Sequence, residues 1–243
     1  MENTFDVNVI STGSAGNCVV IDNKIMIDAG LGDKDIGSTL DEIDYLLITH
    51  RHGDHLNLGA LKKLHKRKPW KLDKCLYVNE DVKQKIIESH NTRFDYIPKD
   101  EHIIGNESIF QLETDEYTYE VETFKLEHDV ENQGFVITRE DGLTMVYATD
   151  TNTMEYAPHR EYDYIVVEAN YDEDKIFDAM LSENFEDRFR ASRNFRHLSI
   201  QQFKEFVRTH RHTKTEIYAL HESGAFGLDS PIYQTGLSID GGE

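Results

Sequence analysis

The sequence predicts an α/β fold of the α+β type, in which helices pack outside two β-sheets. Three observations lead to this prediction: a group of short apolar runs at the start, a strand-rich middle, and helical spacing of apolar residues after each of them. The chain has 243 residues, of which 38% are hydrophobic, so it is long enough for one sizeable core and short for two ordinary domains. We therefore expect one domain over residues 1–229 and a tail over residues 230–243, a stretch with little core-forming power.

The first part of the chain predicts short strands followed by helices. Glycine-rich and Asp-Asn turns separate the first apolar runs, which is typical of strands joined by tight turns. Leu58, Leu61 and Leu64 recur at helical spacing and form one apolar stripe. The expected strands are residues 5–11, 18–21, 24–28 and 44–49, and the expected helices are residues 58–65 and 81–89.

The rest of the chain predicts a second group of strands followed by helices. The first four of these strands are expected to form an antiparallel series, because they follow one another closely. The expected strands are residues 109–112, 117–126, 134–138, 143–148, 164–168 and 216–220, and the expected helices lie around residues 176–181 and 199–208.

The composition restricts the classes of function. A formal net charge of −20 repels long polyanions, since non-specific nucleic-acid affinity comes largely from Lys and Arg. This charge does not exclude a small phosphorylated substrate, or a nucleic-acid end whose charge is neutralised by metal. No apolar run approaches the roughly 18 residues of a membrane span, and the N-terminus does not resemble a signal peptide. With only Cys18 and Cys75, a disulfide framework is not expected, and a reducing cytosol is the expected location.

The strongest chemical signal is the segment that follows the apolar strand at residues 44–49. It contains His50, His52, Asp54 and His55, three imidazoles and a carboxylate within six residues. Imidazole nitrogens suit zinc and similar ions, and a carboxylate adds the negative charge that helps to hold a second cation. The alternative, a solvated polar loop, does not explain so dense a set of metal ligands.

Further ligand types follow other predicted strands. His128, Asp150 and His221 each come just after a strand of the second group. Taken alone, each is an ordinary loop residue, but polar residues placed after several strands can converge on one point of a rigid sheet. Together with the first motif they predict two divalent metal ions. Zinc is expected because nitrogen and carboxylate ligands are mixed, and manganese is the alternative.

The remaining histidines are expected to be unrelated to metal binding. Thr209–His212 repeats Thr49–His52 residue for residue, but it ends a helical stretch and lacks the following Gly-Asp-His. We interpret it as a polar helix terminus, where cationic side chains favour the helix dipole. The histidines interpreted as surface residues without partners nearby are His65, His90, His102 and His159.

These residues resemble the metallo-β-lactamase superfamily. Residues 50–55 match its His-x-His-x-Asp-His signature, and residues 27–30, Ile-Asp-Ala-Gly, match the strand end before it. The order of motifs extends the resemblance over residues 5 to about 225, and it implies a four-layer αββα sandwich. Within the superfamily the chain is similar to the phosphodiesterase branch, which includes tRNase Z, a cyclic phosphodiesterase and bacterial exonucleases. The Ser- and Gly-rich turn at residues 11–17 and the His-Leu-Ser element at residues 197–199 carry this narrower resemblance.

The resemblance implies a role for each candidate ligand. One ion would be bound by His50, His52 and His128, the other by Asp54, His55 and His221, with Asp150 between them. His197 would lie beside the ions, where it would either stabilise charge or donate a proton at the scissile phosphate. Asp54 would take the nucleophile's proton or anchor the second ion. Asp28 would accept a hydrogen bond from a ligand histidine and fix its tautomer, or alternatively cap its strand end.

A basic segment precedes His197 in this acidic chain. Residues 188–196 contain four arginines and two phenylalanines. Arginine matches phosphate geometry and aromatic rings stack on bases, so we expect a loop in which Arg193 and Arg196 bind a nucleotide. The alternative is a solvated face. The sequence leaves open whether the segment serves its own subunit or the neighbour in a homodimer.

These features predict a metal-dependent phosphodiesterase. A cyclic mononucleotide is the favoured substrate, because the charge of −20 argues against an extended grip on a duplex and the arginine-rich segment is short. The phage enzymes that degrade cyclic nucleotides look similar in size and pattern. The alternatives are a DNA or RNA exonuclease acting on a nucleic-acid end, a thioester, lactone or β-lactam hydrolase, and a binding module without activity. No membrane partner is expected.

Overall fold

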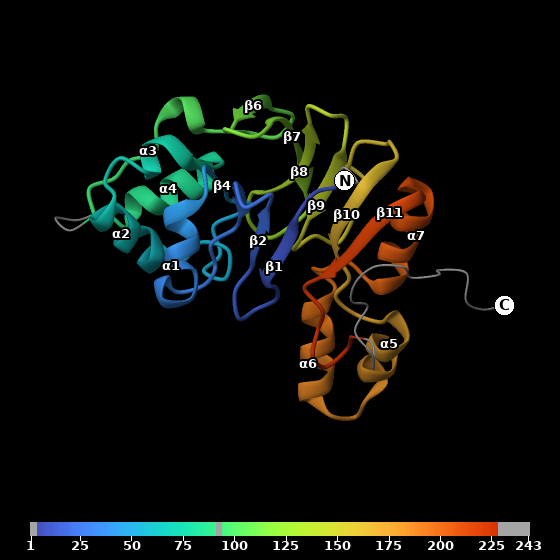
Figure 1. Ribbon diagram of the computed structural model, residues 1–243. Helices are drawn as coiled ribbons and strands as arrows, with labels where there is room; N and C mark the ends of the chain where they lie inside the picture. Colours follow the sequence, from blue (N-terminus) through green and yellow to red (C-terminus); the bar gives the residue numbers. More distant parts are fainter. Residues whose placement is uncertain (1–3, 91–93, 228–243) are drawn as a thin grey trace. The chain divides into compact units, whose positions relative to one another are not determined.

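The computed structural model describes residues 4–90 and 94–227 and confirms the predicted fold class, with two sheets and helices that pack on them (Figure 1). The chain forms two compact units. The first is Met1–Thr123 with Val130–Gln133, and the second is Phe124–Asp129 with Gly134–Glu243. The expected single domain over residues 1–229 stays a prediction, and the expected tail at residues 230–243 lies outside the described residues. In the described part, no helix is long and apolar enough to cross a membrane.

The first unit is built on a five-stranded sheet of order β1-β2-β3-β4-β5. Its strands are β1 (Val7–Ser11), β2 (Cys18–Ile21), β3 (Ile25–Ile27), β4 (Tyr45–Leu47) and β5 (Leu76–Tyr77). The pairs β1–β2 and β2–β3 are antiparallel, whereas β3–β4 and β4–β5 are parallel. Because β3 and β4 are parallel neighbours, the segments that follow them emerge at the same edge of the sheet.

Helices of the first unit cover this sheet. They are α1 (Asp33–Glu42), α2 (Leu58–Arg67), α3 (Leu72–Cys75) and α4 (Glu80–Glu88), with a short 3-10 turn, η1 (Asp100–His102). Each helix places buried residues in one core with the strands. The side chain of Asn57 caps α2 and that of Asn79 caps α4 by accepting a backbone N–H. The sequence did not predict α1, because its N-cap residue, Gly32, provides no side-chain cap and its apolar face is small.

The second unit contains strands in the order β11-β10-β9-β8-β7. They are β7 (Thr118–Leu126), β8 (Asn132–Arg139), β9 (Thr144–Ala148), β10 (Tyr162–Glu168) and β11 (Arg211–Leu220). Strand β7 begins in the first unit, where it pairs with β6 (Ile109–Glu113), and the first two residues of β8 also belong to the first unit. The expected antiparallel pairing is confirmed for β6–β7 and β8–β9. Strands β9, β10 and β11 are parallel, so their carboxyl ends meet at one edge.

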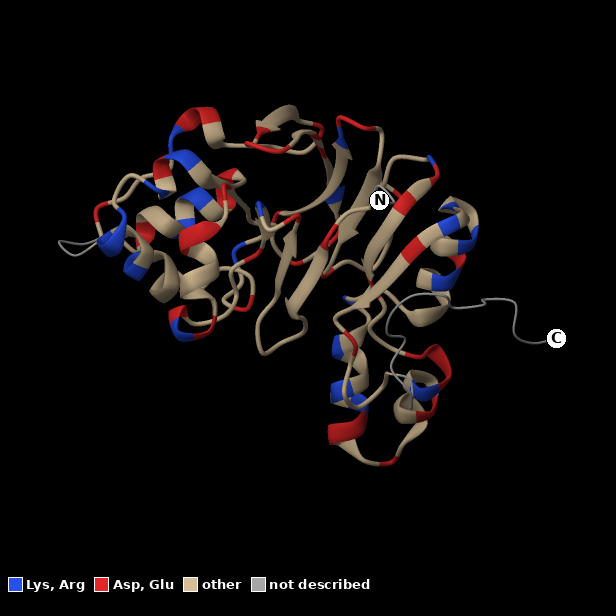
Figure 2. Cartoon of the chain, in the orientation of Figure 1, with Lys and Arg blue, Asp and Glu red and all other residues tan. Residues whose placement is uncertain are grey.

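Three helices complete the second unit: α5 (Glu173–Leu181), α6 (Phe185–Asn194) and α7 (Ile200–His210). Helix α7 begins with a capping box of Ser199 and Gln202, and it buries Phe203 and Val207 in a core with β10 and β11. The expectation of a loop at residues 188–196 is wrong for most of the segment, which lies in α6. The Asn184 side chain caps this helix, and Ala191 packs in a small cluster with α5. Figure 2 shows basic residues along α6.

The structure corrects the interpretation of several histidines. The segment Thr209–His212 does end a helix at His210, as predicted, but Arg211 begins β11. His159 is not without a partner: its Nδ1 lies 3.1 Å from Nε2 of His210. His65 contacts Asp95 and is half-buried, so it is not a plain surface residue either. His102 is half-buried too, and its ring stacks on that of Tyr77 at a centroid distance of 4.4 Å.

Candidate metal centre

The loop after β4 is anchored by a buried carboxylate. Asp28, which follows β3, accepts hydrogen bonds from the backbone N–H of Thr49 at 2.9 Å and from its hydroxyl. The carboxylate also contacts His55, whose Nδ1 lies 2.7 Å from Oδ2. Burial raises the pKa of Asp28, while His55 and Thr49 oppose that rise. The parallel pairing of β3 and β4 brings these residues together, although they are far apart in sequence.

Two imidazoles of this loop point donor nitrogens at each other. Nε2 of His50 lies 3.1 Å from Nδ1 of His52. Two nitrogens bound to one tetrahedral zinc ion at about 2.0–2.1 Å would be about 3.3 Å apart. The separation therefore fits two ligands of a single cation. His50 is fully buried, and Thr49 Oγ1 lies 3.1 Å from its Nδ1, which leaves Nε2 as the ligand atom.

A second pair of donor atoms lies at the end of the same loop. The bond between His55 Nδ1 and Asp28 fixes the tautomer with a proton on Nδ1 and a lone pair on Nε2. This Nε2 is 3.9 Å from Oδ2 of Asp54. The Asn17 amide nitrogen lies 2.8 Å from the same Nε2, so a cation that binds there must displace this hydrogen bond. Residues 50–55 thus carry two pairs of donor atoms: His50 with His52 at the beginning and Asp54 with His55 at the end.

Gly30 is the point where three segments of this site cross. A Cβ on Gly30 would lie 1.8 Å from the carbonyl oxygen of Asp54 and 2.7 Å from the backbone nitrogen of Asn17. The backbone of Asn17 also donates to that carbonyl at 2.7 Å. No side chain larger than that of glycine fits unless the loop that carries Asp54 moves.

We predict that Gly30→Ala destabilises the protein by about 1–3 kcal/mol and lowers its metal content, because overpacking against backbone must displace the loop. Thermal unfolding and metal analysis of the purified variant measure both effects. Gly53→Ala is the matched control: Gly53 lies within the histidine motif, yet a Cβ there meets nothing within 4 Å. Its stability should change by less than about 0.5 kcal/mol. Equal melting temperatures for Gly30→Ala and the unchanged protein would contradict the prediction.

In the second unit, polar side chains gather where the parallel strands end. Asp150 follows β9, Glu168 ends β10 and His221 follows β11, and His197 precedes α7. Each of these residues offers one ligand atom, and the four atoms lie within 4.8 Å of one another. Asp150 and His221 adopt positive φ angles of 55° and 56°, which turn the chain sharply after the strands. This half of the chain therefore also carries a potential ligand set.

Glu168 is the member of this cluster that the sequence analysis did not single out. Its Oε1 lies 2.6 Å from Nδ1 of His197 and 3.2 Å from Nδ1 of His221. It is fully buried, and the backbone N–H of Thr151 donates to its other oxygen. Asn170 adds a contact of 3.0 Å to Nδ1 of His221. One sequence signal was present: an acidic residue ends an otherwise apolar strand, where a buried charge needs a partner.

The carboxylates and imidazoles of this cluster stabilise each other's charged forms. Burial by itself would lower the pKa of His197, but Glu168 and Asp150 raise it to about 10. Burial would raise the pKa of Glu168, but His197 and His221 hold it below its ordinary value. The pKa of His221 is raised by Asp150 and Glu168 against the effect of burial. Without bound metal, His197 is therefore an imidazolium at neutral pH.

His128 borders a small cavity in the same unit. The cavity has a volume of about 250 Å³ and is lined by Glu127, His128, Asp129, Asn152 and Arg196. Nε2 of His128 lies 3.2 Å from Asp129, and Arg196 binds the same carboxylate at 3.1 Å. Of the two arginines expected to bind substrate, Arg196 thus lies beside a candidate ligand, whereas Arg193 is exposed at the end of α6.

This chain belongs to the metallo-β-lactamase superfamily. The family model described as "Beta-lactamase superfamily domain" matches residues 23–221, most of the chain, which includes every candidate ligand. The match confirms the family that the histidine motif indicated.

Among curated proteins, the chain is similar to exodeoxyribonuclease WalJ of Streptococcus pneumoniae. The two are 29% identical over 186 residues, which cover 69% of this chain and 63% of the relative. The chain therefore spans less than two thirds of the length of that relative.

Solved structures share the fold. The human tRNase Z short form has a TM-score of 0.60 at 18% identity and covers 89% of this chain and 92% of its own. The metallo-β-lactamase fold protein YhfI from Bacillus subtilis has a TM-score of 0.62 at 16% identity, over 93% of this chain and 89% of its own. At 18% and 16% identity, these similarities confirm the shared fold alone.

Proposed function

We propose that this chain is a metal-dependent phosphodiesterase that hydrolyses nucleotide phosphodiester bonds. One observation carries the proposal: the loop after β4 presents two donor pairs, His50 with His52 at 3.1 Å and Asp54 with His55 at 3.9 Å. Two pairs on one short loop suit two cations held side by side, the arrangement of phosphate-cleaving two-metal sites. The similarity to an exodeoxyribonuclease and the fold shared with a tRNase Z support the choice of substrate class.

The remaining ligands are proposed from the order of motifs in the family. His128 would complete the set of His50 and His52, and His221 would complete that of Asp54 and His55. Asp150 would be shared by both ions. Zinc is the proposed metal because imidazole and carboxylate donors are mixed, with manganese as the alternative. When bound, two such ions activate a water near neutral pH, hold the phosphate oxygens and offset charge on the leaving oxygen.

The chain's own side chains would supply the proton transfers. Asp54, whose side chain is 30% exposed, has two proposed roles. It would either only bind the second ion or also accept the proton of the attacking water. His197 uses Nδ1 to contact Glu168 at 2.6 Å, so Nε2 remains for the substrate. Because this contact orients the ring, His197 can donate a hydrogen bond or a proton from Nε2 to the departing oxygen.

Two substrates of this class are each favoured by an observation. A DNA or RNA end is favoured by the similarity to an exodeoxyribonuclease. A cyclic mononucleotide is favoured by the net charge of −20, which opposes an extended grip on nucleic acid. Arg196, which borders the cavity next to His128, is proposed to contact the phosphate in either case, together with Arg193 in the last turn of α6.

The proposal is tested by incubating the zinc- or manganese-loaded protein with four substrates: bis(p-nitrophenyl) phosphate, cyclic mononucleotides, end-labelled DNA or RNA, and a thioester or lactone. We expect hydrolysis of the first and of at least one nucleotide substrate, and no hydrolysis after chelation by EDTA. Cleavage of labelled strands from one end identifies an exonuclease. Cleavage of cyclic mononucleotides alone identifies a cyclic-nucleotide phosphodiesterase. Hydrolysis of only the thioester or lactone would overturn the proposal, as would less than one bound metal ion per chain.

The cellular setting is proposed from the cysteines. Cys18 and Cys75 are both buried and free, and burial raises the pKa of each thiol to about 12, so neither is reactive at neutral pH. Such cysteines suit a reducing cytosol, where we propose that the protein acts. Homodimer formation stays a prediction, to be measured by the mass of the protein in solution.

A further inference from the structure

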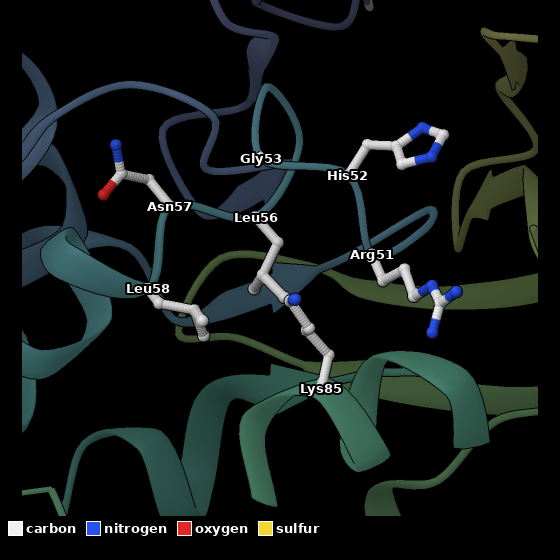
Figure 3. Close-up of a pocket in the computed structure, with 7 residues that line it drawn as sticks. All are labelled: Arg51, His52, Gly53, Leu56, Asn57, Leu58 and Lys85. Carbon is white, nitrogen blue, oxygen red and sulfur yellow. The ribbon is translucent and has the colours of Figure 1, made fainter. Parts of the chain in front are cut away.

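A second cavity lies in the first unit, against the histidine loop. It has a volume of about 600 Å³ and lies between the segment from Arg51 to Leu58 and helix α4. Figure 3 shows Lys85 extending from α4 toward Leu56, with Arg51 and His52 on the chain above. Because His52 is a proposed metal ligand, the cavity borders the site where the proposed reaction occurs.

The lining of this cavity is basic, although the chain as a whole is acidic. Its charged residues are Arg51 and Lys85, and no Asp or Glu is among the lining residues. The chain has 46 acidic residues against 26 Lys and Arg, so a cavity with cations alone departs from the general composition. The rest of the lining, Leu56 and Leu58 included, is uncharged apart from the imidazole of His52.

Lys85 differs from the neighbouring lysine on the same helix. Lys83 is bound to Asp100 at 2.9 Å and to Glu80 at 3.5 Å. Lys85 is half-buried, and within residues 4–90 and 94–227 its side chain has no hydrogen bond or ion pair. A lysine in the last turn of a helix gains only a little from the helix dipole. An ammonium group that is partly withdrawn from water and lacks a carboxylate is suited to an anion from outside the chain.

Arg51 provides a second, less free cation at the same cavity. Its Nη1 lies 3.2 Å from Asp81, and its side chain is 41% exposed. An exposed ion pair of this kind is weak, about 0–1 kcal/mol, so the guanidinium can turn to a phosphate at little cost. Arginine and lysine together offer a forked donor and a point charge, the combination that binds phosphate groups.

We propose that this cavity binds a second phosphate of the substrate, one that flanks the scissile phosphodiester. The inference rests on the proposed phosphodiesterase function and narrows its substrate class. A cyclic mononucleotide has a single phosphate, which the metal site would occupy. A cation pair outside that site is useful only for a substrate with at least two phosphates, such as a short strand or its phosphorylated end. The cavity therefore favours nucleic-acid ends over cyclic mononucleotides.

The test compares Lys85→Gln with Lys83→Gln, which removes a charge from the same helix but away from the cavity. On a short single-stranded DNA, Lys85→Gln should raise KM about tenfold with kcat changed less than twofold. The slope of log(kcat/KM) against log salt should become less negative by about 0.7, the value for one phosphate contact on a single strand. On bis(p-nitrophenyl) phosphate, which has one phosphate, KM should not change. Lys83→Gln should behave as the unchanged protein on both substrates.

Binding gives a readout that does not depend on turnover. The affinity of the metal-loaded protein for a fluorescein-labelled trinucleotide, measured by fluorescence anisotropy, should fall about tenfold in Lys85→Gln and stay constant in Lys83→Gln. Equal affinities for both variants would overturn the inference, as would equal losses on the DNA and the one-phosphate substrate. Failure of the unchanged protein to hydrolyse any phosphodiester would instead refute the proposed function, and the binding comparison would still decide whether the cavity takes a phosphate.

Discussion

Replacement of Asp54 by asparagine should lower kcat by about 10³-fold, equal to about 4 kcal/mol of barrier, and should reduce the bound metal from two ions per chain toward one. Asparagine has the same shape but no negative charge, so the ion proposed to bind at Asp54 and His55 would lose one of its two carboxylate ligands and keep only the shared Asp150. The loop itself should stay in place, because Asp28 and Thr49 anchor it. Metal analysis of dialysed protein and rates on bis(p-nitrophenyl) phosphate measure the two effects.

The control for this substitution is Asp115→Asn. Asp115 is 74% exposed and pairs with Lys24, at a position between β6 and β7. Its neutralisation removes the same charge from the same unit, so metal content and rate should stay within twofold of the unchanged protein. Two tightly bound ions and an undiminished rate in Asp54→Asn would show that Asp54 is neither a ligand nor a base.

Replacement of His197 by glutamine should lower kcat by about 10²–10⁴-fold on substrates with a sugar hydroxyl as leaving group, while metal content is unchanged. Such a leaving group needs a proton, and His197 is the imidazole whose Nδ1 contacts Glu168 at 2.6 Å, so that Nε2 remains for the substrate. On bis(p-nitrophenyl) phosphate the loss should be below about tenfold, because p-nitrophenolate departs without protonation. The contrast between the two leaving groups separates proton donation from a loss of structure.

His212→Gln provides the matched control for the second unit. His212 also pairs with a carboxylate, Asp163 at 3.0 Å, but at the opposite end of β10 and β11. His212→Gln should change kcat by no more than about twofold, both on substrates with a sugar hydroxyl as leaving group and on bis(p-nitrophenyl) phosphate. If His197→Gln lost equal activity on both kinds of substrate, His197 would be a positioning residue and not an acid.

Local sequence patterns determined most of the strands and several helices. Strand β2 has the predicted bounds, and β9 and β6 differ from prediction by one residue each. Alternating or continuous apolar runs predict such elements, because the spacing of apolar residues within a segment indicates which of its residues are buried. Helix α6 was not predicted, since its many arginines conceal the single buried Ala191 and the Asn184 cap that define it.

The sequence alone also indicated the loop that we propose as metal-binding. His50, His52, Asp54 and His55 lie so close along the chain that any fold brings them near one another, so their chemistry can be inferred from spacing. The resemblance carried by this motif was enough to indicate the superfamily that the family model confirms.

Only the tertiary structure decided which distant groups support these residues. Glu168 meets His197 and His221 because parallel strands end at one edge, and Asn17 reaches His55 because Gly30 lets the chain pass closely. The cavity at Lys85 exists because α4 packs beside the histidine loop. Such contacts depend on how strands pair and helices pack over tens of residues, and the local spacing of a sequence carries no record of that packing.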